Sequence, residues 1–193
     1  MHWKSLFLGA AIAAAAFLTA GRVFSGDDAP PAGGPTPEEL KLMQPGPEHE
    51  ALKEYEGSWD GKGMYMGAGW NSKMDAKMIL GGRFLQLDEA ITVPTPGEPM
   101  VVHSVGFVGY DNLQKKYVHM QMGEESTAFL TDDGLHDATR KLSEMRGVAH
   151  RPGKDMKYRF TITDVANGAF HSEFFADPGE GEKSMMTGEY RKK

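Results

Sequence analysis

Along most of the chain, apolar and polar residues alternate with a period of two. The clearest case is residues 155–163, where Met156, Tyr158, Phe160 and Ile162 alternate with polar neighbours. A period of two puts alternate side chains on opposite faces of a strand, so this segment predicts a half-buried strand. The same pattern predicts about ten strands, at residues 59–66, 73–80, 83–91, 100–110, 116–122, 127–131, 141–149, 155–163, 169–176 and 184–191.

Short segments of turn-forming residues separate these strands, among them Gly81-Gly82, Asp133-Gly134 and Asn167-Gly168. Consecutive strands joined so closely are antiparallel, because a parallel crossover needs a dozen or more residues. Left open, a sheet of this size has two exposed edges, and closure removes both. The pattern therefore predicts an all-β fold, an antiparallel up-and-down closed β-barrel whose interior is packed solid or holds one small ligand.

Before the first strand the pattern is different. Residues 26–37 are Gly, Pro, Asp, Ala and Thr, which predicts a flexible linker that we extend over residues 26–44. Within it, Thr36-Pro37 and Glu39 form a helix-start signature that predicts a brief helix over 37–43. A second short helix is predicted from Pro47 to about Glu56. The barrel domain is then residues 45–193.

The first 25 residues have the order of a secretory signal peptide. Lys4 precedes an apolar run over residues 5–20, and small residues follow before Gly26. As a helix, this run spans about 24 Å, less than the ~30 Å of membrane hydrocarbon, so cleavage is favoured over an uncleaved membrane anchor. We expect an exported protein, periplasmic or extracellular, with no stable membrane span once residues 1–25 are removed.

Composition narrows the kinds of chemistry. The chain has 193 residues and a net charge of −6 without a cluster of cations, so nucleic acid is not an expected partner. The absence of Cys excludes disulfides, thiolate metal sites and a Cys nucleophile. We find no metal-binding spacing of histidines, no nucleophile elbow and no dinucleotide fingerprint. We therefore expect no metal and no resident cofactor, and no motif supports an enzymatic activity.

A series of short motifs runs through the predicted barrel domain: Pro45-Gly46-Pro47-Glu48-His49-x-x-Leu52, Gly57-x-Trp59, Ile79 to Leu85 (ILGGRFL), Gly109-Tyr110-Asp111-Asn112 and Glu189-Tyr190-Arg191-Lys192. In order and spacing it resembles a bacterial family of uncharacterised domains, domain of unknown function 1579, with a calycin-like (lipocalin-like) β-barrel. The resemblance spans residues 45–193 and implies the fold but no activity. In calycin-type barrels a Gly-x-Trp on the first strand plugs the closed end. Trp59 is then implied to close the barrel, with Arg191 stacked on it.

The period of two also nominates side chains for the interior. On the fourth predicted strand His103 shares a face with Phe107, and we expect this apolar face to point inward. The chain has 13 Met, whose thioether side chains adapt to irregular apolar shapes and suit either a cavity wall or a filled core. The predicted ligand-binding residues are His103, Phe107, Met78, Met122, Tyr158 and Phe160. The alternative for His103 is a single hydrogen-bonded histidine of the barrel wall.

Other polar residues are further candidates for a functional role. A haem on His171 is a minor alternative, by analogy with nitric-oxide-binding barrels, because the alternation of strand residues places His171 on the solvent side. Asp132-Asp133 is interpreted as a solvated turn. Four glutamates lie within predicted strands, and any that faced an apolar interior would have a raised pKa: Glu89, Glu144, Glu173 and Glu189.

These observations predict an exported, non-catalytic barrel that binds a small hydrophobic or amphipathic molecule in its cavity. One alternative is an enzyme that uses the same cavity, with His103 or a buried Glu as acid or base. Another is a solid barrel that acts through its outer surface as an interaction module.

Overall fold

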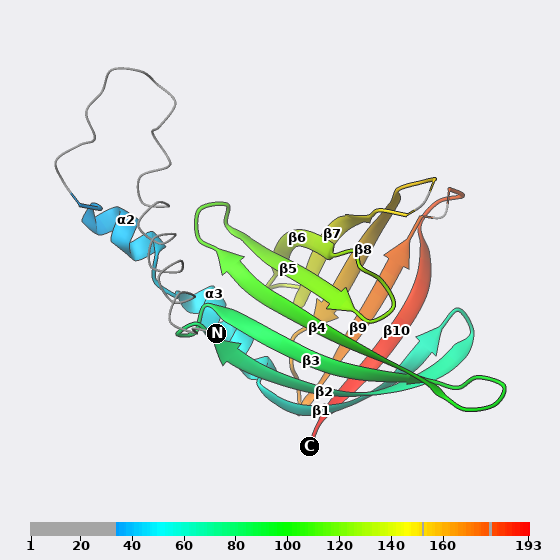
Figure 1. Ribbon diagram of the computed structural model, residues 1–193. Coiled ribbons are helices and arrows are strands. Elements are labelled where there is room, and N and C mark those ends of the chain that lie inside the picture. Colours follow the sequence, from blue (N-terminus) through cyan, green and yellow to red (C-terminus); the bar gives the residue numbers. More distant parts are fainter. Residues whose placement is uncertain (1–33, 152, 178) are drawn as a thin grey trace, which may run out of the picture. The chain divides into compact units, whose positions relative to one another are not determined.

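The computed structural model describes residues 34–151, 153–177 and 179–193, so the predicted signal peptide and residues 26–33 of the linker lie outside the described residues. Ten antiparallel strands form one closed barrel in the order β1-β10-β9-β8-β7-β6-β5-β4-β3-β2, which confirms the predicted up-and-down fold (Figure 1). The strands are β1 (Gly57–Tyr65), β2 (Ala68–Ile79), β3 (Phe84–Val93), β4 (Met100–Asp111), β5 (Lys116–Gly123), β6 (Leu130–Asp137), β7 (Leu142–Ala149), β8 (Met156–Thr163), β9 (Ala169–Ala176) and β10 (Lys183–Lys192).

Strand β6 differs most from its prediction. The sequence predicts a strand at 127–131 and a turn at Asp133-Gly134, but Gly134 lies inside β6, between Tyr117 of β5 and Met145 of β7. The run Asp132-Asp133-Gly134 has the composition of a turn, and tertiary partners override that local preference. The turn comes at Asp137, whose Oδ1 accepts hydrogen bonds from the backbone N–H groups of Thr139 and Arg140.

Within residues 34–56, three short helices precede β1: α2 (Pro37–Leu42), α3 (Pro47–Leu52) and the 3₁₀ helix η2 (Lys53–Tyr55). The predicted cap of α2 is present, since Glu39 N donates to Thr36 Oγ1 (3.2 Å) and Thr36 N donates to Glu39 Oε2 (2.7 Å). No helix among the described residues has both the length and the apolar character needed to cross a lipid bilayer.

Helix α3 is held at one end of the barrel, where it packs against β3 and β4 while η2 packs against β2 (Figure 1). The buried His49 caps α3 from within, because its Nδ1 accepts the N–H of Gly46 at 3.0 Å. The His49 ring meets Tyr110 of β4 edge-on, with centroids 5.9 Å apart. Tyr117 of β5 adds a hydrogen bond from its hydroxyl to Glu48 O (3.3 Å).

Two side chains from barrel turns bind the backbone just before α3. Arg83, in the turn between β2 and β3, donates from Nη2 to Met43 O (2.9 Å). Asn112, in the turn between β4 and β5, donates from Nδ2 to the carbonyls of Leu42 and Gln44, both at 2.9 Å. The motif residues His49, Arg83 and Asn112 therefore position the helical segment at this end of the barrel.

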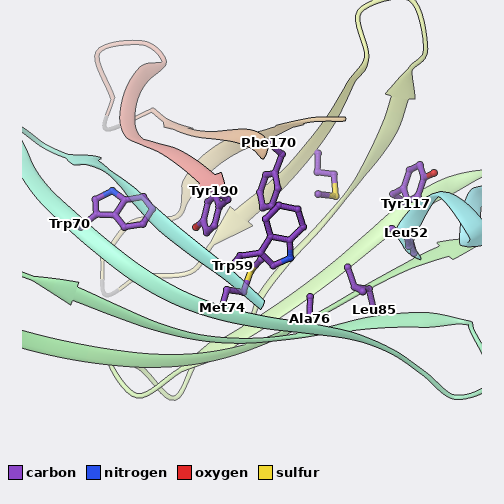
Figure 2. Close-up of a cluster of buried hydrophobic side chains, with 10 residues drawn as sticks. Leu52, Trp59, Trp70, Met74, Ala76, Leu85, Tyr117, Phe170 and Tyr190 are labelled. Carbon is purple, nitrogen blue, oxygen red and sulfur yellow. The ribbon is translucent and has the colours of Figure 1, made fainter. Parts of the chain in front are cut away.

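One side of the barrel interior is filled by aromatic side chains. We call Trp59, Trp70, Phe170 and Tyr190 the aromatic wall; they come from β1, β2, β9 and β10, which are neighbours in the closed sheet. Phe170 stacks on Tyr190 with centroids 4.6 Å apart, and its ring meets Trp59 edge-on at 4.9 Å. Figure 2 shows the wall as a row that runs from Trp70 through Tyr190 to Phe170 and Trp59.

Glycines make room for the largest rings of the wall. Gly63 of β1 and Gly188 of β10 lie opposite each other. A Cβ at Gly63 would approach Trp70 Cζ2 to 2.7 Å, and one at Gly188 would approach the same atom to 2.9 Å. The fully buried Trp59 donates from Nε1 to Tyr55 O at 2.8 Å, which connects the wall to η2. The side chains on this side of the interior are consequently close-packed.

Trp59 is fully buried next to η2, and its cationic neighbour differs from the expectation. Lys192 pairs with Trp59 across the β1–β10 ladder and places Nζ 5.3 Å from the ring centroid. Arg191 lies opposite Asp60 on the exposed outer face and pairs with Glu189. Since Tyr190 points inward, alternation directs Arg191 outward, and the predicted stacking of Arg191 on Trp59 is replaced by Lys192.

Candidate ligand-binding site

The other side of the interior contains a cavity of about 210 Å³. Most of its lining comes from β3 to β8, with α3 and η2 at one end and with Phe170 and Tyr190 at the boundary with the aromatic wall. We call the interior faces of β3 to β8 the hollow side and those of β9, β10, β1 and β2 the packed side. The apolar lining residues of the hollow side are Leu85, Leu87, Val108, Met145, Phe160 and Ile162.

Small inward residues on β4 create this space. Ser104 and Gly106 point into the barrel, opposite Glu89 and Leu87 of β3. A Cβ at Gly106 would meet His119 Nε2 at 3.4 Å and Leu87 Cδ1 at 3.6 Å, which are ordinary contacts. The interior beyond Gly106 is therefore open, in contrast to the tight surroundings of Gly63 and Gly188.

A hydrogen-bonded cluster of polar side chains flanks the cavity. Asp132 Oδ2 lies 3.0 Å from His119 Nδ1 and accepts the hydroxyl of Tyr158 at 2.9 Å. The two side chains of the His119–Asp132 pair are 10% and 2% exposed. The Phe160 ring stacks beside His119 with centroids 6.5 Å apart. Because Nδ1 is engaged by Asp132, the nitrogen that His119 presents toward Gly106 and the cavity is Nε2.

A buried carboxyl group lies where the cavity meets the aromatic wall. Glu89 of β3 accepts a hydrogen bond from the Tyr190 hydroxyl at 2.9 Å, across the interior from β10. Burial raises the pKa of Glu89, and the hydroxyl groups of Ser72 and Tyr190 only partly oppose the rise. Burial and the adjacent Glu89 charge together hold the pKa of Tyr190 well above its ordinary value. Both groups thus keep their protons more firmly than they would in water.

The cavity reaches solvent beside η2. His136 and Asp164 line it and are 28% and 35% exposed, and the exposed Glu54 lines it as well. His136 Nδ1 lies 3.2 Å from Ser143 Oγ and 3.6 Å from Asp164 Oδ1. A Ser-His-Asp nucleophile needs the serine and the carboxylate on different ring nitrogens, and here both face Nδ1. These residues therefore form a polar rim and lack the geometry of a nucleophilic triad.

The segment that forms the barrel and the helices α3 and η2 is also the segment that matches a known family. A family model described as a protein of unknown function (DUF1579) matches residues 44–192. The chain belongs to the DUF1579 family. No curated protein matches the sequence. Membership confirms the resemblance found in the motifs.

In this DUF1579 barrel, one predicted ligand-binding residue lines the cavity: Phe160. Tyr158 and Met78 pack among other side chains and do not line the cavity. The Tyr158 hydroxyl donates to Asp132 and to Thr131 O. His103, Phe107 and Met122 lie on the outer face of β4 and β5, since Ser104, Gly106 and Val108 are the inward residues of β4. The structure therefore moves these last three residues out of the site.

The assignment of His103 and Phe107 to the interior rested on taking the more apolar face of β4 as the inner one. The inner face of β4 instead carries small residues, Ser104 and Gly106, where it borders the cavity. The observed register places Met122 opposite Val105, and His119 opposite the inward Val108. The site residues that sequence reasoning missed are therefore His119, Asp132 and Gln121.

The remaining histidines and glutamates lie as follows. His171 lies on the outer face of β9, between the inward Phe170 and Ser172, so it cannot hold a haem inside the barrel. Of the glutamates in strands, Glu89 alone lines the cavity, whereas Glu144 pairs with Arg146 and Glu189 with Arg191 on the outside. Among the residues that the structure describes, no cluster of three or more His, Asp and Glu side chains suits a metal ion.

Proposed function

We propose that this DUF1579 protein binds one small amphipathic molecule in the cavity of its hollow side. The observation that carries the proposal is the combination of an apolar lining with a few oriented polar groups, Glu89, His119 and Gln121, in one cavity that opens beside η2. Ligand sites are typically concave, mostly apolar and provided with a small number of such polar groups. A barrel that acted only through its outer surface would have no need of them.

The size of the cavity limits the ligand. Its volume of about 210 Å³ is below the roughly 300–1,000 Å³ of pockets for drug-sized molecules. An engineered protein cavity of about 150 Å³ accepts benzene. The expected ligand is therefore a single-ring or short-chain compound, with its apolar part against Leu85, Leu87 and Phe160.

The test compares the natural chain with two variants on β4. The protein is purified without denaturation, and small molecules released on denaturation are measured by mass spectrometry, beside native mass spectra. Gly106→Leu fills the cavity, whereas His103→Ala changes the outer face of the same strand. We expect a bound molecule in the natural chain and in His103→Ala, and none in Gly106→Leu.

Two results would contradict the proposal. One is equal occupancy of Gly106→Leu, which would put the ligand elsewhere. The other is an empty natural chain whose melting temperature no single-ring probe raises, since a ligand of the folded state must stabilise it.

A second candidate function, acid–base catalysis on the bound molecule, is favoured by the His119–Asp132 pair. A carboxylate on Nδ1 fixes the ring and leaves Nε2 to exchange a proton with a molecule in the cavity. Incubation of the released ligand with the natural chain and with His119→Gln distinguishes the two functions. Conversion that depends on His119 would show an enzyme, and retention of unchanged ligand by both proteins would show a binder.

We further propose that the protein acts outside the cytoplasm, because residues 1–25 have the pattern of a cleaved signal peptide. The amino-terminal sequence of the protein from its own host tests this directly. A mature chain that begins near Gly26 is the expected result, and a chain that retains residues 1–25 would contradict cleavage.

A further inference from the structure

Acidic side chains line the cavity, but among the described residues no side chain with a permanent positive charge does. Its acidic and histidine lining residues are Glu54, Glu89, His119, His136 and Asp164. Neither lysine nor arginine is among the residues that the structure places around this cavity. The lining therefore offers negative charge and hydrogen-bond acceptors but no permanent positive charge.

Two of the inward carboxylates have their own partners. Asp132 has His119 at 3.0 Å, and Asp164 has His136 at 3.6 Å. Glu89 is different, because its carboxyl group accepts a hydrogen bond from the neutral hydroxyl of Tyr190 at 2.9 Å and has no ion pair with any residue that the structure describes. Burial raises the pKa of Glu89, and no neighbouring cation opposes this rise. A buried carboxylate without a positive partner is costly, and a cation delivered by a ligand would remove that cost.

On the basis of the proposed function, we propose that the cavity selects a small primary amine, a single-ring or short-chain alkylammonium compound whose ammonium group pairs with Glu89. The ammonium would lie beside the Tyr190 hydroxyl, at the boundary between the cavity and the aromatic wall. The hydrocarbon part would lie against Leu85, Leu87 and Phe160. A carboxylate ligand of the same size would meet Glu89 without any lysine or arginine to neutralise it.

Three probes of nearly equal size test whether the cavity prefers a cationic, a neutral or an anionic ligand. 2-Phenylethylamine is a cation, 2-phenylethanol is neutral, and phenylacetate is an anion. Their dissociation constants are measured by calorimetry at pH 7 with the full chain, Glu89→Gln and His103→Ala. A charge-assisted hydrogen bond contributes about 1.5–3 kcal/mol, which corresponds to about tenfold or more in affinity. We expect the amine to bind about tenfold or more tightly than the alcohol, and phenylacetate to bind most weakly.

In Glu89→Gln, we expect the amine to lose about tenfold or more in affinity while the alcohol changes less than about threefold, and His103→Ala should match the natural chain. The order of the three probes on the natural chain is itself a test that needs no variant to fold. Equal or tighter binding of the alcohol or of phenylacetate would overturn this inference and leave the proposed function standing. Failure of all three probes to bind would contradict the proposed function itself, and this inference with it.

Discussion

The two sides of the barrel interior are built from the same kind of strand, but one side is filled by aromatic rings and the other contains a cavity. On the packed side, β9, β10, β1 and β2 bring four large rings together, and Gly63 and Gly188 leave room for the Trp70 ring. On the hollow side, β4 carries Ser104 and Gly106 at positions where no large ring fills the space they leave. The same residue type therefore makes room for protein on one side and leaves a cavity on the other.

The comparison also separates two sources of stability. The aromatic wall is stabilised by buried apolar area and ring contacts, which depend little on pH. The hollow side depends on a few hydrogen bonds between titratable groups, such as His119 with Asp132 and Tyr190 with Glu89. We infer that the packed side supplies most of the stability of the fold and that the hollow side is where the protein interacts with other molecules.

The largest expected effect is the loss of Trp59. Trp59→Ala removes a fully buried ring together with its hydrogen bond to Tyr55 O, and we expect the free energy of unfolding to fall by about 3–5 kcal/mol. Phe160→Ala is expected to cost less, because the Phe160 ring already borders the cavity. Urea denaturation measures both. Equal losses for the two variants would break the distinction between the sides.

The hollow side has its own sensitive residue in Asp132. Asp132→Ala removes the carboxylate partner of the buried His119 and one of the two acceptors of the Tyr158 hydroxyl, and we expect a loss of about 1–3 kcal/mol in the free energy of unfolding. The control is Asp133→Ala, one residue along on the outside, which removes an exposed pair with Lys116 and should cost less than about 1 kcal/mol. If Asp133 proved the more sensitive residue, the interior role of Asp132 would be refuted.

The same substitution at two inward glycines sharpens the comparison. Gly188→Ala would bring a Cβ within 2.9 Å of Trp70 Cζ2, so we expect a loss of about 1–3 kcal/mol from overpacking. Gly106→Ala meets only ordinary contacts, and we expect a change within about 1 kcal/mol. Thermal and urea denaturation of the two variants measures this difference in stability. A larger loss of stability in Gly106→Ala than in Gly188→Ala would argue against an open cavity.

The smallest expected effect is a dependence on pH. Because the pKa of Glu89 is raised in the folded state, its stabilising contribution is fully present below the unfolded pKa and is lost as the pH rises through the folded pKa. Glu89→Gln removes this loss, so the stability of the variant relative to the natural chain should be higher at pH 8 than at pH 4. The free energy of unfolding is measured from pH 4 to pH 8 for the natural chain and the variant, with Glu144→Gln on the outer face as control. This tests whether the contribution of Glu89 to stability falls as the pH rises.

The sequence predicted the architecture well and the site poorly, for physical reasons. The alternation of apolar and polar residues, together with turns such as Asn167-Gly168, is a local property, and it sufficed for ten strands and their closure. Alternation also separates two faces of each strand, but it does not say which is the inner one when the interior is hollow. On β4 the more apolar face, with His103 and Phe107, is the outer one, and the inner face carries Ser104 and Gly106.

Other site residues depended on long-range contacts. Asp132 resembles a turn residue until His119 and Tyr158 are brought beside it by β5 and β8. Glu89 was recognised as a conditional candidate, but whether it faced inward depended on the register of β3 against β2 and β4. The useful signal was the pair Ser104 and Gly106, since small residues on one face of a barrel strand indicate space inside.

The most direct test of the central claim, that the hollow side is the ligand site, is the titration of the ¹⁵N-labelled protein with 2-phenylethylamine or 2-phenylethanol, followed by amide chemical shifts. The predicted result is a set of saturable shifts at Ser104, Gly106, His119 and Gln121, with Gly63 and Gly188 unchanged and with no shifts in Gly106→Leu. Shifts confined to the outer surface, or equal shifts on both sides of the interior, would contradict the account.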